Sequence, residues 1–204
     1  MCCVTIATAV AGCGHVIAGT PVMQALAGED KCAQSSGPMV TIDPQSDGEP
    51  VMRIPQPPNW KRDTRLDSQL IRYVMTNHAL VADRFSAYAA VTLEDVTSKD
   101  ISAEQVIASE WASVRTIGGA SELTVTSNRS VCGYPAQTVT YTVPQIGAIP
   151  TRFGTALAVV TPGVRKYAAV ITVQSADPTN PTYKADAQTI IDGFQIMPET
   201  GGNH

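Results

Sequence analysis

Residues 138–143 read Thr-Val-Thr-Tyr-Thr-Val, and this stretch decides the fold class of the chain. Val139, Tyr141 and Val143 alternate with threonines, so an apolar side chain recurs at every second residue. Successive residues of a strand point to opposite faces of a sheet, and β-branched side chains pack well on its pleated surface. A period of two, with polar residues between the apolar ones, therefore predicts a half-buried antiparallel strand.

Apolar runs on both sides of this stretch predict the rest of the sheet. Turn residues such as Pro57-Pro58-Asn59 and Thr161-Pro162-Gly163 bound them, and proline interrupts the hydrogen-bond ladder of a sheet. Further strands are expected at 51–55, 71–75, 86–93, 123–127, 153–160, 167–173 and 194–196, with turns around 128–129 and 132–135.

Two helices interrupt the strands. Ser102 and Gln105 have capping-box spacing, and Gly118-Gly119 is expected to end that helix. Asn180 is a good N-cap with Pro181 at the first helical position, and Gly193 marks the end of the second helix. Apolar stripes follow the two starts, at Ala103, Ile107, Trp111 and Val114 and at Tyr183, Ala187, Ile190 and Ile191. This order indicates an α+β fold with an antiparallel sheet rather than a Rossmann-type fold.

The N-terminus has the features of an export signal. A run of small and apolar residues leads to Val10-Ala11-Gly12-Cys13, which matches the bacterial lipobox and predicts lipidation of Cys13. Residues 1–12 contain no Lys or Arg, so the basic n-region of a signal peptide is missing. The segment is too short to span a bilayer, and the alternative is a small buried strand in a cytosolic protein.

These patterns divide the chain into four parts. Residues 1–12 are interpreted as the signal segment, and 13–48 as the lipidated cysteine and a flexible tether. Residues 49–198 are the expected α+β domain, and 199–204 a C-terminal tail. The protein is therefore expected to be exported and held at the extracytoplasmic face of the membrane, or in the envelope, by its lipid alone.

Composition and cysteine spacing argue against several classes of function. The net charge is −4, and the longest basic cluster, Lys61-Arg62, is followed at once by Asp63, so no basic face for nucleic acid is expected. The five cysteines show no C-x-x-C or Cys/His spacing, and no metal site is expected. Gly118-Gly119 stands alone without a phosphate-binding loop, so no cofactor is expected either.

Catalytic machinery is not evident. No Gly-x-Ser-x-Gly pentad is present, and His78 is interpreted as an ordinary turn or surface residue. The adjacent carboxylates Glu94 and Asp95 lie on a strand end, where they point to opposite faces. Cys132 lacks a local partner base, so it is interpreted as a turn cysteine, either free or disulfide-bonded to Cys32 in an oxidising compartment.

The two tryptophans leave two interpretations open. Trp60 follows a strand corner and Trp111 lies on the apolar stripe of the first helix. Both positions are typical of core residues, and the alternative is a hydrophobic ligand groove between helix and sheet.

Several local sequences resemble the LpqN/LpqT family of mycobacterial lipoproteins. The resemblance covers roughly residues 49–198 together with Cys13, and the tether is poorer in Thr and Pro than is usual in that family. It is carried by Met52-Arg53-Ile54-Pro55 with Pro57-Pro58-Asn59-Trp60, by Gly133-Tyr134-Pro135-Ala136, by residues 166–173, and by residues 185–194. The resemblance implies a PsbP-like fold, an antiparallel sheet sandwiched by helices, and residence in the cell envelope.

The expected function is that of a non-enzymatic envelope lipoprotein that takes part in envelope biogenesis. Its partner is expected to be an envelope lipid or glycolipid, or another protein such as an envelope transporter. The alternatives are an adaptor or host-interacting surface protein without a small ligand, and an enzyme of unrecognised chemistry. An apolar cavity would favour lipid binding, a filled core with an exposed apolar patch an adaptor, and a cleft of converging polar groups an enzyme.

Overall fold

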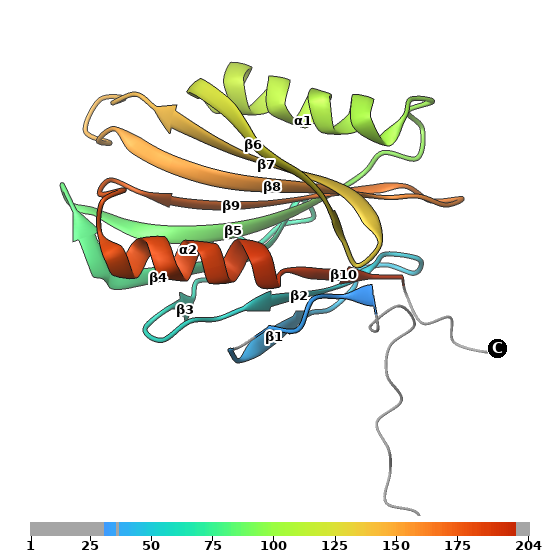
Figure 1. Cartoon of the computed structure of the whole chain (residues 1–204), viewed down its shortest axis with the longest axis horizontal. Coiled ribbons are helices and arrows are strands. Elements are labelled where there is room, and N and C mark those ends of the chain that lie inside the picture. The colour runs from blue at the N-terminus through green and yellow to red at the C-terminus, as the bar shows by residue number, and fades with distance from the viewer. Residues whose placement is uncertain (1–30, 36, 199–204) are drawn as a thin grey trace, which may run out of the picture.

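A computed structural model describes residues 31–35 and 37–198 (Figure 1). The strands are β1 (Met39–Ile42), β2 (Val51–Pro55), β3 (Lys61–Arg62), β4 (Ile71–Ala82), β5 (Phe85–Asp95), β6 (Ser121–Val131), β7 (Tyr134–Val143), β8 (Arg152–Thr161), β9 (Tyr167–Ser175) and β10 (Gln195–Met197). The helices are α1 (Ala103–Thr116) and α2 (Pro181–Gly193). The predicted α+β class with antiparallel strands is therefore confirmed.

The main sheet has seven strands in the order β3-β4-β5-β9-β8-β7-β6, and every neighbouring pair is antiparallel. β5 and β9 are neighbours in the sheet, although α1 and the meander β6-β7-β8 separate them in the sequence. The meander extends the sheet outward from β9, in the order β8, β7, β6. β6 is consequently an edge strand that pairs with β7 alone.

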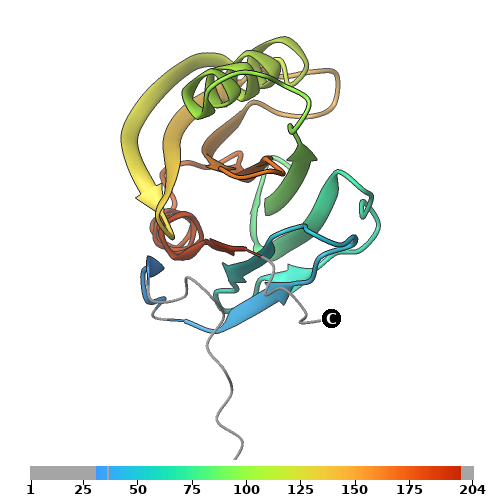
Figure 2. The ribbon, with the colours of Figure 1, turned by 90° about the vertical axis from the view of Figure 1, so that its right-hand side faces the viewer.

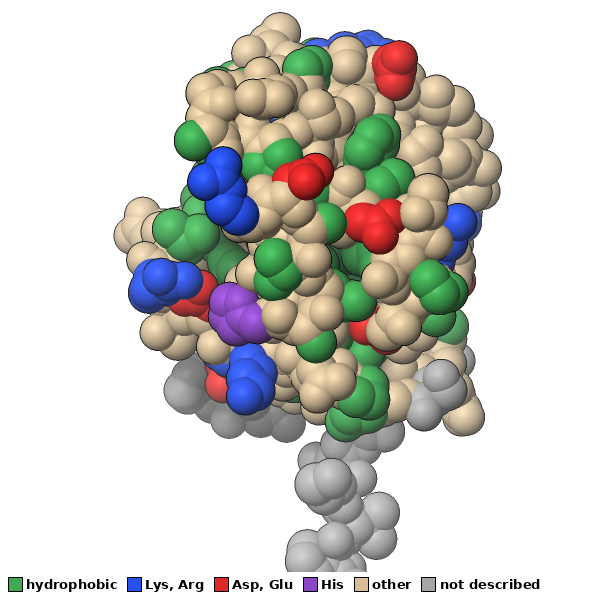
Figure 3. Space-filling view, turned by 90° about the vertical axis from the view of Figure 1, so that its left-hand side faces the viewer, with side chains coloured by type: hydrophobic (Ala, Val, Ile, Leu, Met, Phe, Trp, Pro, Cys, Tyr) green, Lys and Arg blue, Asp and Glu red, His purple; other side chains and the backbone are tan. Residues whose placement is uncertain are grey.

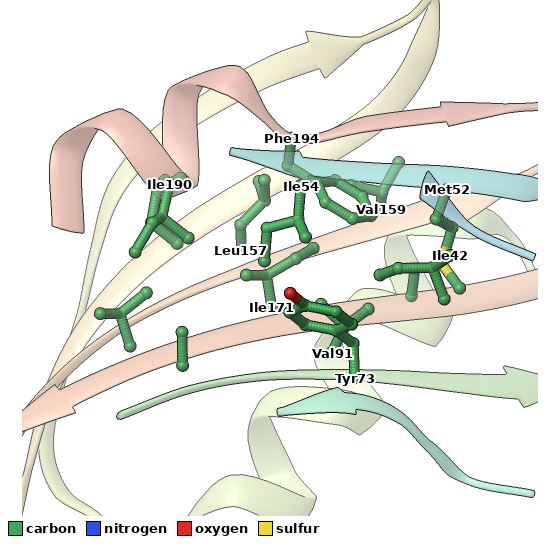
Figure 4. Close-up of a cluster of buried hydrophobic side chains, with 14 of the residues drawn as sticks. Ile42, Met52, Ile54, Tyr73, Val91, Leu157, Val159, Ile171, Ile190 and Phe194 are labelled. Carbon is green, nitrogen blue, oxygen red and sulfur yellow. The ribbon is translucent and has the colours of Figure 1, made fainter. Parts of the chain in front are cut away.

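Three layers result (Figure 2). α1 covers one face of the main sheet, where Val106, Ile107 and Trp111 pack on β7, β8 and β9. α2 and a second, three-stranded sheet of order β1-β2-β10 cover the opposite face. The core between these layers is apolar, with Phe194, Ile54 and Leu157 fully buried at its centre (Figure 4).

Both helices begin where the sequence predicts. The Ser102 side chain accepts a hydrogen bond from the Gln105 backbone N–H, and the Gln105 side chain accepts one from the Ser102 backbone N–H. Asn180 Oδ1 accepts from the backbone N–H groups of Thr182 and Tyr183. Each cap satisfies amides that have no partner inside the helix, and this fixes the first turn locally.

Two predictions about irregular segments are wrong. Residues 39–42, assigned to the flexible tether, form β1 and pair antiparallel with β2, so the folded unit begins before residue 49. Asn128 and Arg129, assigned to a turn, lie within β6, where pairing with Gln137 and Ala136 keeps the strand going to Val131. Both errors have one cause: pairing with a neighbouring strand extends a strand beyond what local propensity indicates.

The predicted signal segment 1–12, Cys13 and the tail 199–204 lie outside the described residues. Within the described part of the chain, neither helix has the length and apolar character needed to cross a membrane.

Candidate functional site

A groove of about 810 Å³ runs between α2 and the strands β6, β7 and β8. Figure 2 shows that β6 and β7 arch away from the rest of the sheet and come down beside α2 at the tip of their hairpin. The helix wall of the groove carries Tyr183, Lys184, Ala187, Gln188, Ile191 and Asp192. The strand wall carries Glu122, Thr124, Thr126, Ser127, Arg129, Thr138, Thr140, Thr142, Phe153 and Thr155.

Hydroxyl groups dominate the strand wall. Thr124 on β6 is paired with Thr140 on β7, and Thr140 is paired in turn with Thr155 on β8. Residues directly opposite each other on neighbouring strands are roughly 5 Å apart, so the three threonines form a row across the groove. A hydroxyl both donates and accepts hydrogen bonds, and the row therefore suits a ligand that also carries several hydroxyls.

The charged groups in the groove balance one another. Arg129 and Lys184 supply two positive charges, while Glu122 and Asp192 supply two negative ones. Arg129 Nη1 lies 2.5 Å from Asp192 Oδ1, and Glu122 Oε2 accepts a hydrogen bond of 3.0 Å from Thr142 Oγ1. A groove without net charge favours a neutral polar ligand over a phosphate or a free carboxylate.

One hydroxyl lining the groove lacks a protein partner. Thr138 is only 7% exposed, and its Oγ1 makes no hydrogen bond with any described residue. Leaving a buried hydroxyl unpaired costs about 1–3 kcal/mol, and a ligand that reaches this oxygen recovers that free energy. Thr138 is thus a buried polar group of the strand wall that a ligand could satisfy.

A smaller groove of about 420 Å³ lies on the other face of β6, against α1. Leu123 and Val125 of β6 line it together with Ile107 and Trp111 of α1. Trp111 is 4% exposed and belongs to the core on this face, while its indole Nε1 donates a 2.6 Å hydrogen bond to Gln137 Oε1. The core interpretation of Trp111 is therefore confirmed, although one side of it borders this groove.

Trp60 is also a core residue. It is almost fully buried, and its indole Nε1 donates a 2.8 Å hydrogen bond to Asp186 Oδ2 on α2. This bond links the strand corner after β2 to the helix that forms one wall of the larger groove.

The remaining candidates from the sequence lie apart from the groove. His78 is exposed on β4, and its Nδ1 is 3.0 Å from Ser86 Oγ on the neighbouring strand. Glu94 pairs with Lys99, whereas Asp95 accepts from the backbone N–H of Thr97, so the two carboxylates do not converge. Among the described residues, no three His, Cys, Asp or Glu side chains gather in a metal-binding arrangement.

Cys32 and Cys132 are joined by a disulfide that spans 100 residues of sequence. Cys132 and Gly133 form the two-residue turn between β6 and β7, and both have positive φ, 50° and 86°. The disulfide therefore fixes the tip of the arching hairpin to the segment that precedes β1.

The surface shown in Figure 3 carries acidic and basic side chains that alternate with small apolar groups. Val81, Ile117, Ile146 and Ile149 are among the exposed large hydrophobic residues of the described chain. Basic side chains do not merge into a continuous area on this face.

No pattern in the sequence predicts the groove. The alternation of Thr138, Thr140 and Thr142 was visible, but it does not reveal which face of the strand stays open. That depends on α2, which begins at Pro181, about 40 residues later, and covers only part of the sheet.

Comparison with known proteins supports the fold. No family model matches the sequence, and no curated protein matches it by sequence. LpqN of Mycobacterium tuberculosis, described as involved in cell envelope biogenesis, superposes with a TM-score of 0.62 at 15% identity, covering 79% of this chain and 91% of LpqN. A protein of unknown function from Pseudomonas aeruginosa reaches a TM-score of 0.43 at 10% identity, covering 73% of this chain and 90% of that one. At this level of identity the similarity shows a distant LpqN-like fold, and it does not show that the chain belongs to the family.

Proposed function

We propose that this protein is a non-catalytic binding protein of the cell envelope, anchored by a lipid on Cys13, and that its larger groove holds the sugar headgroup of an envelope glycolipid. The observation that carries the proposal is the hydroxyl-lined groove of about 810 Å³ with balanced charges. Lipid anchoring and export rest on the lipobox at residues 10–13.

The chemistry of the groove favours a sugar over a bare acyl chain. An acyl chain makes no hydrogen bonds, so it would leave the row Thr124, Thr140 and Thr155 desolvated and unpaired. A sugar places hydroxyls against both the threonines and the charged side chains. The partly apolar surfaces of Tyr183 and Phe153 in the same groove can contact the ring carbons.

The balanced charges also argue against catalysis as the main role of this site. The carboxylate of Asp192 is paired with Arg129, and that of Glu122 with the hydroxyl of Thr142. No histidine or cysteine is among the described residues that line the groove. We therefore infer that the groove holds its ligand without transforming it.

Two further facts support an envelope role. LpqN, whose fold this chain shares, is described as involved in cell envelope biogenesis. A domain tethered to the membrane meets membrane glycolipids at high local concentration, so modest affinity suffices for binding.

The test is a titration of the protein with short-chain alkyl glycosides and envelope glycolipids. Isothermal titration calorimetry and native mass spectrometry measure the binding. Saturable 1:1 binding is expected, and Thr140→Val should weaken it about fivefold to tenfold, because a hydrogen bond worth roughly 1–1.5 kcal/mol is lost. The matched control is Thr92→Val, a strand threonine whose hydroxyl bonds to Val170 O outside the groove. Absence of binding across the panel would contradict the proposal and favour a protein partner.

A further inference from the structure

The hairpin that forms the outer wall of the groove is held at its tip by two links. The first is the Cys32–Cys132 disulfide in the turn between β6 and β7. The second is Arg129, two residues before the end of β6, whose Nη2 donates a 2.6 Å hydrogen bond to Ile191 O and whose Nη1 pairs with Asp192. Both links join the hairpin to elements outside the main sheet.

β6 depends on these links more than other strands do. It is an edge strand that pairs with β7 alone, and its pairing is irregular at two places, between Ser121 and Thr124 and between Val125 and Ser127. Most of its residues are exposed or half-buried, so little apolar burial holds it in place. An edge strand with few buried contacts opens at low free-energy cost unless its far end is fixed.

The partner side of the disulfide is itself fixed. Gln195 Nε2 on β10 donates a 2.8 Å hydrogen bond to Ala33 O, next to Cys32. Cys132 is buried within the central core cluster, and Cys32 packs against the same cluster. The disulfide thus connects the tip of the arch to the segment that is bonded to the small sheet.

The Arg129 link is weaker and reversible. Its guanidinium lies at the C-terminal end of α2, where a positive charge complements the partial negative charge of the last carbonyls. It is partly exposed, however, and the Nε atom of Arg129 makes no hydrogen bond with any described residue. An exposed ion pair of this kind contributes little by itself.

We propose that the Cys32–Cys132 disulfide is a redox-sensitive latch that keeps the groove closed along its outer wall. A dithiol reductant attacks Sγ of Cys32, the less buried of the two cysteines, and the Cys132 thiolate leaves; the second thiol of the reductant then releases Cys32. The products are two protein thiols and the cyclic disulfide of the reductant. The tip then retains the Arg129 link and the buried side chains of Val131 and Cys132, and the arch of β6 and β7 opens away from α2 more readily than when the disulfide is intact. The meaning of this opening for ligand release rests on the function proposed above.

Hydrogen exchange of the full chain, with and without dithiothreitol, tests the latch without any ligand. Reduction is expected to raise exchange at the β6 amides that pair with β7 at least tenfold, at labelling times at which the β5 and β9 amides stay protected both before and after reduction. Unchanged protection in β6, or an equal increase in all strands, would overturn the proposal. Because the folded wild-type protein is reduced in place, the result does not depend on whether a cysteine variant folds.

Two variants complete the design. Cys132→Ser should exchange like the reduced wild type and should not respond to dithiothreitol; a response would assign the effect to another cysteine and overturn the proposal. Arg129→Gln with the disulfide intact should raise β6 exchange less than threefold, and full opening would show that the disulfide does not hold the arch. Binding of an alkyl glycoside is measured separately, so failure of the proposed ligand leaves the exchange result standing.

Discussion

The ring of Tyr141 lies directly over the backbone of Gly154, its partner across β7 and β8: a Cβ atom on residue 154 would be 2.4 Å from Tyr141 Cζ. The missing side chain lets the ring cross β8, and Tyr141 Oη accepts a 2.7 Å hydrogen bond from Gln174 Nε2 on β9. One glycine thus permits a contact that ties three strands together at the end of the larger groove.

Gly154→Ala should therefore destabilise the fold by roughly 1–3 kcal/mol, because the new methyl group forces the buried ring aside. Chemical denaturation measures the effect. In a Tyr141→Val background the same substitution should cost less than about 1 kcal/mol. An equal cost in both backgrounds would mean that the ring is not the obstacle.

Acid should weaken the protein through Glu49. Burial alone would raise the pKa of this carboxyl, but hydrogen bonds from Arg72, Gln45 and Ser46, with the charge of Arg72, outweigh burial and lower the pKa to about 2. The folded-state pKa is below the ordinary value of 4.5, so this contribution, roughly 3 kcal/mol, is complete above about pH 5 and is lost as the pH falls toward 2. Denaturation midpoints at pH 6 and pH 3 measure it. Glu49→Gln should reduce the difference in stability between pH 6 and pH 3. An unchanged difference in this variant would assign the acid sensitivity to other groups.

Reduction of the Cys32–Cys132 disulfide should also lower global stability. Closing a loop of 100 residues restricts the unfolded chain, and the loop-entropy relation gives roughly 4–5 kcal/mol for a loop of this length. Guanidinium denaturation with and without dithiothreitol measures the change. Cys132→Ser should have the same free energy of unfolding as the reduced wild type. A difference below about 1 kcal/mol between the oxidised and the reduced wild type would contradict the entropic argument.

Trp111 should behave as a core residue. Trp111→Ala is expected to cost roughly 3–5 kcal/mol, because the cavity cannot close between α1 and the sheet. Trp111→Phe keeps most of the apolar contact and loses the hydrogen bond to Gln137, so its cost should be clearly smaller. Thermal denaturation of both variants decides the matter, and similar costs would show that the hydrogen bond, not packing, dominates.

The anchor predicted at Cys13 is tested by intact mass spectrometry of the protein from its native envelope. A diacylglycerol adduct on Cys13 is expected, and Cys13→Ser should abolish both the adduct and partition into detergent. Cys2→Ser is the matched control, since no lipobox precedes Cys2. An unmodified Cys13 in the mature protein would rule out lipid anchoring at this residue.

The sequence predicted what local interactions determine. The caps at Ser102 and Asn180 act within one helical turn, so both helix starts were found. The alternation around Tyr141 was sufficient for an antiparallel sheet. β1 was missed because its four residues are held by pairing with β2 and not by their own pattern. The groove was missed because its walls come from α2 and from β6–β8, which only the tertiary fold brings together.

The small sheet has a consequence for the order in which the chain can finish folding. β10, at residues 195–197, pairs with β2 at residues 51–53, so almost the entire domain lies between these two partners. Such distant pairing is entropically costly and forms late. A chain that emerges N-terminus first, from a ribosome or a translocation channel, holds β2 without this neighbour until residues 195–197 are free. Until then Ile54 and Met52 stay uncovered on one side, and the domain stays open to chaperones, proteases and aggregation.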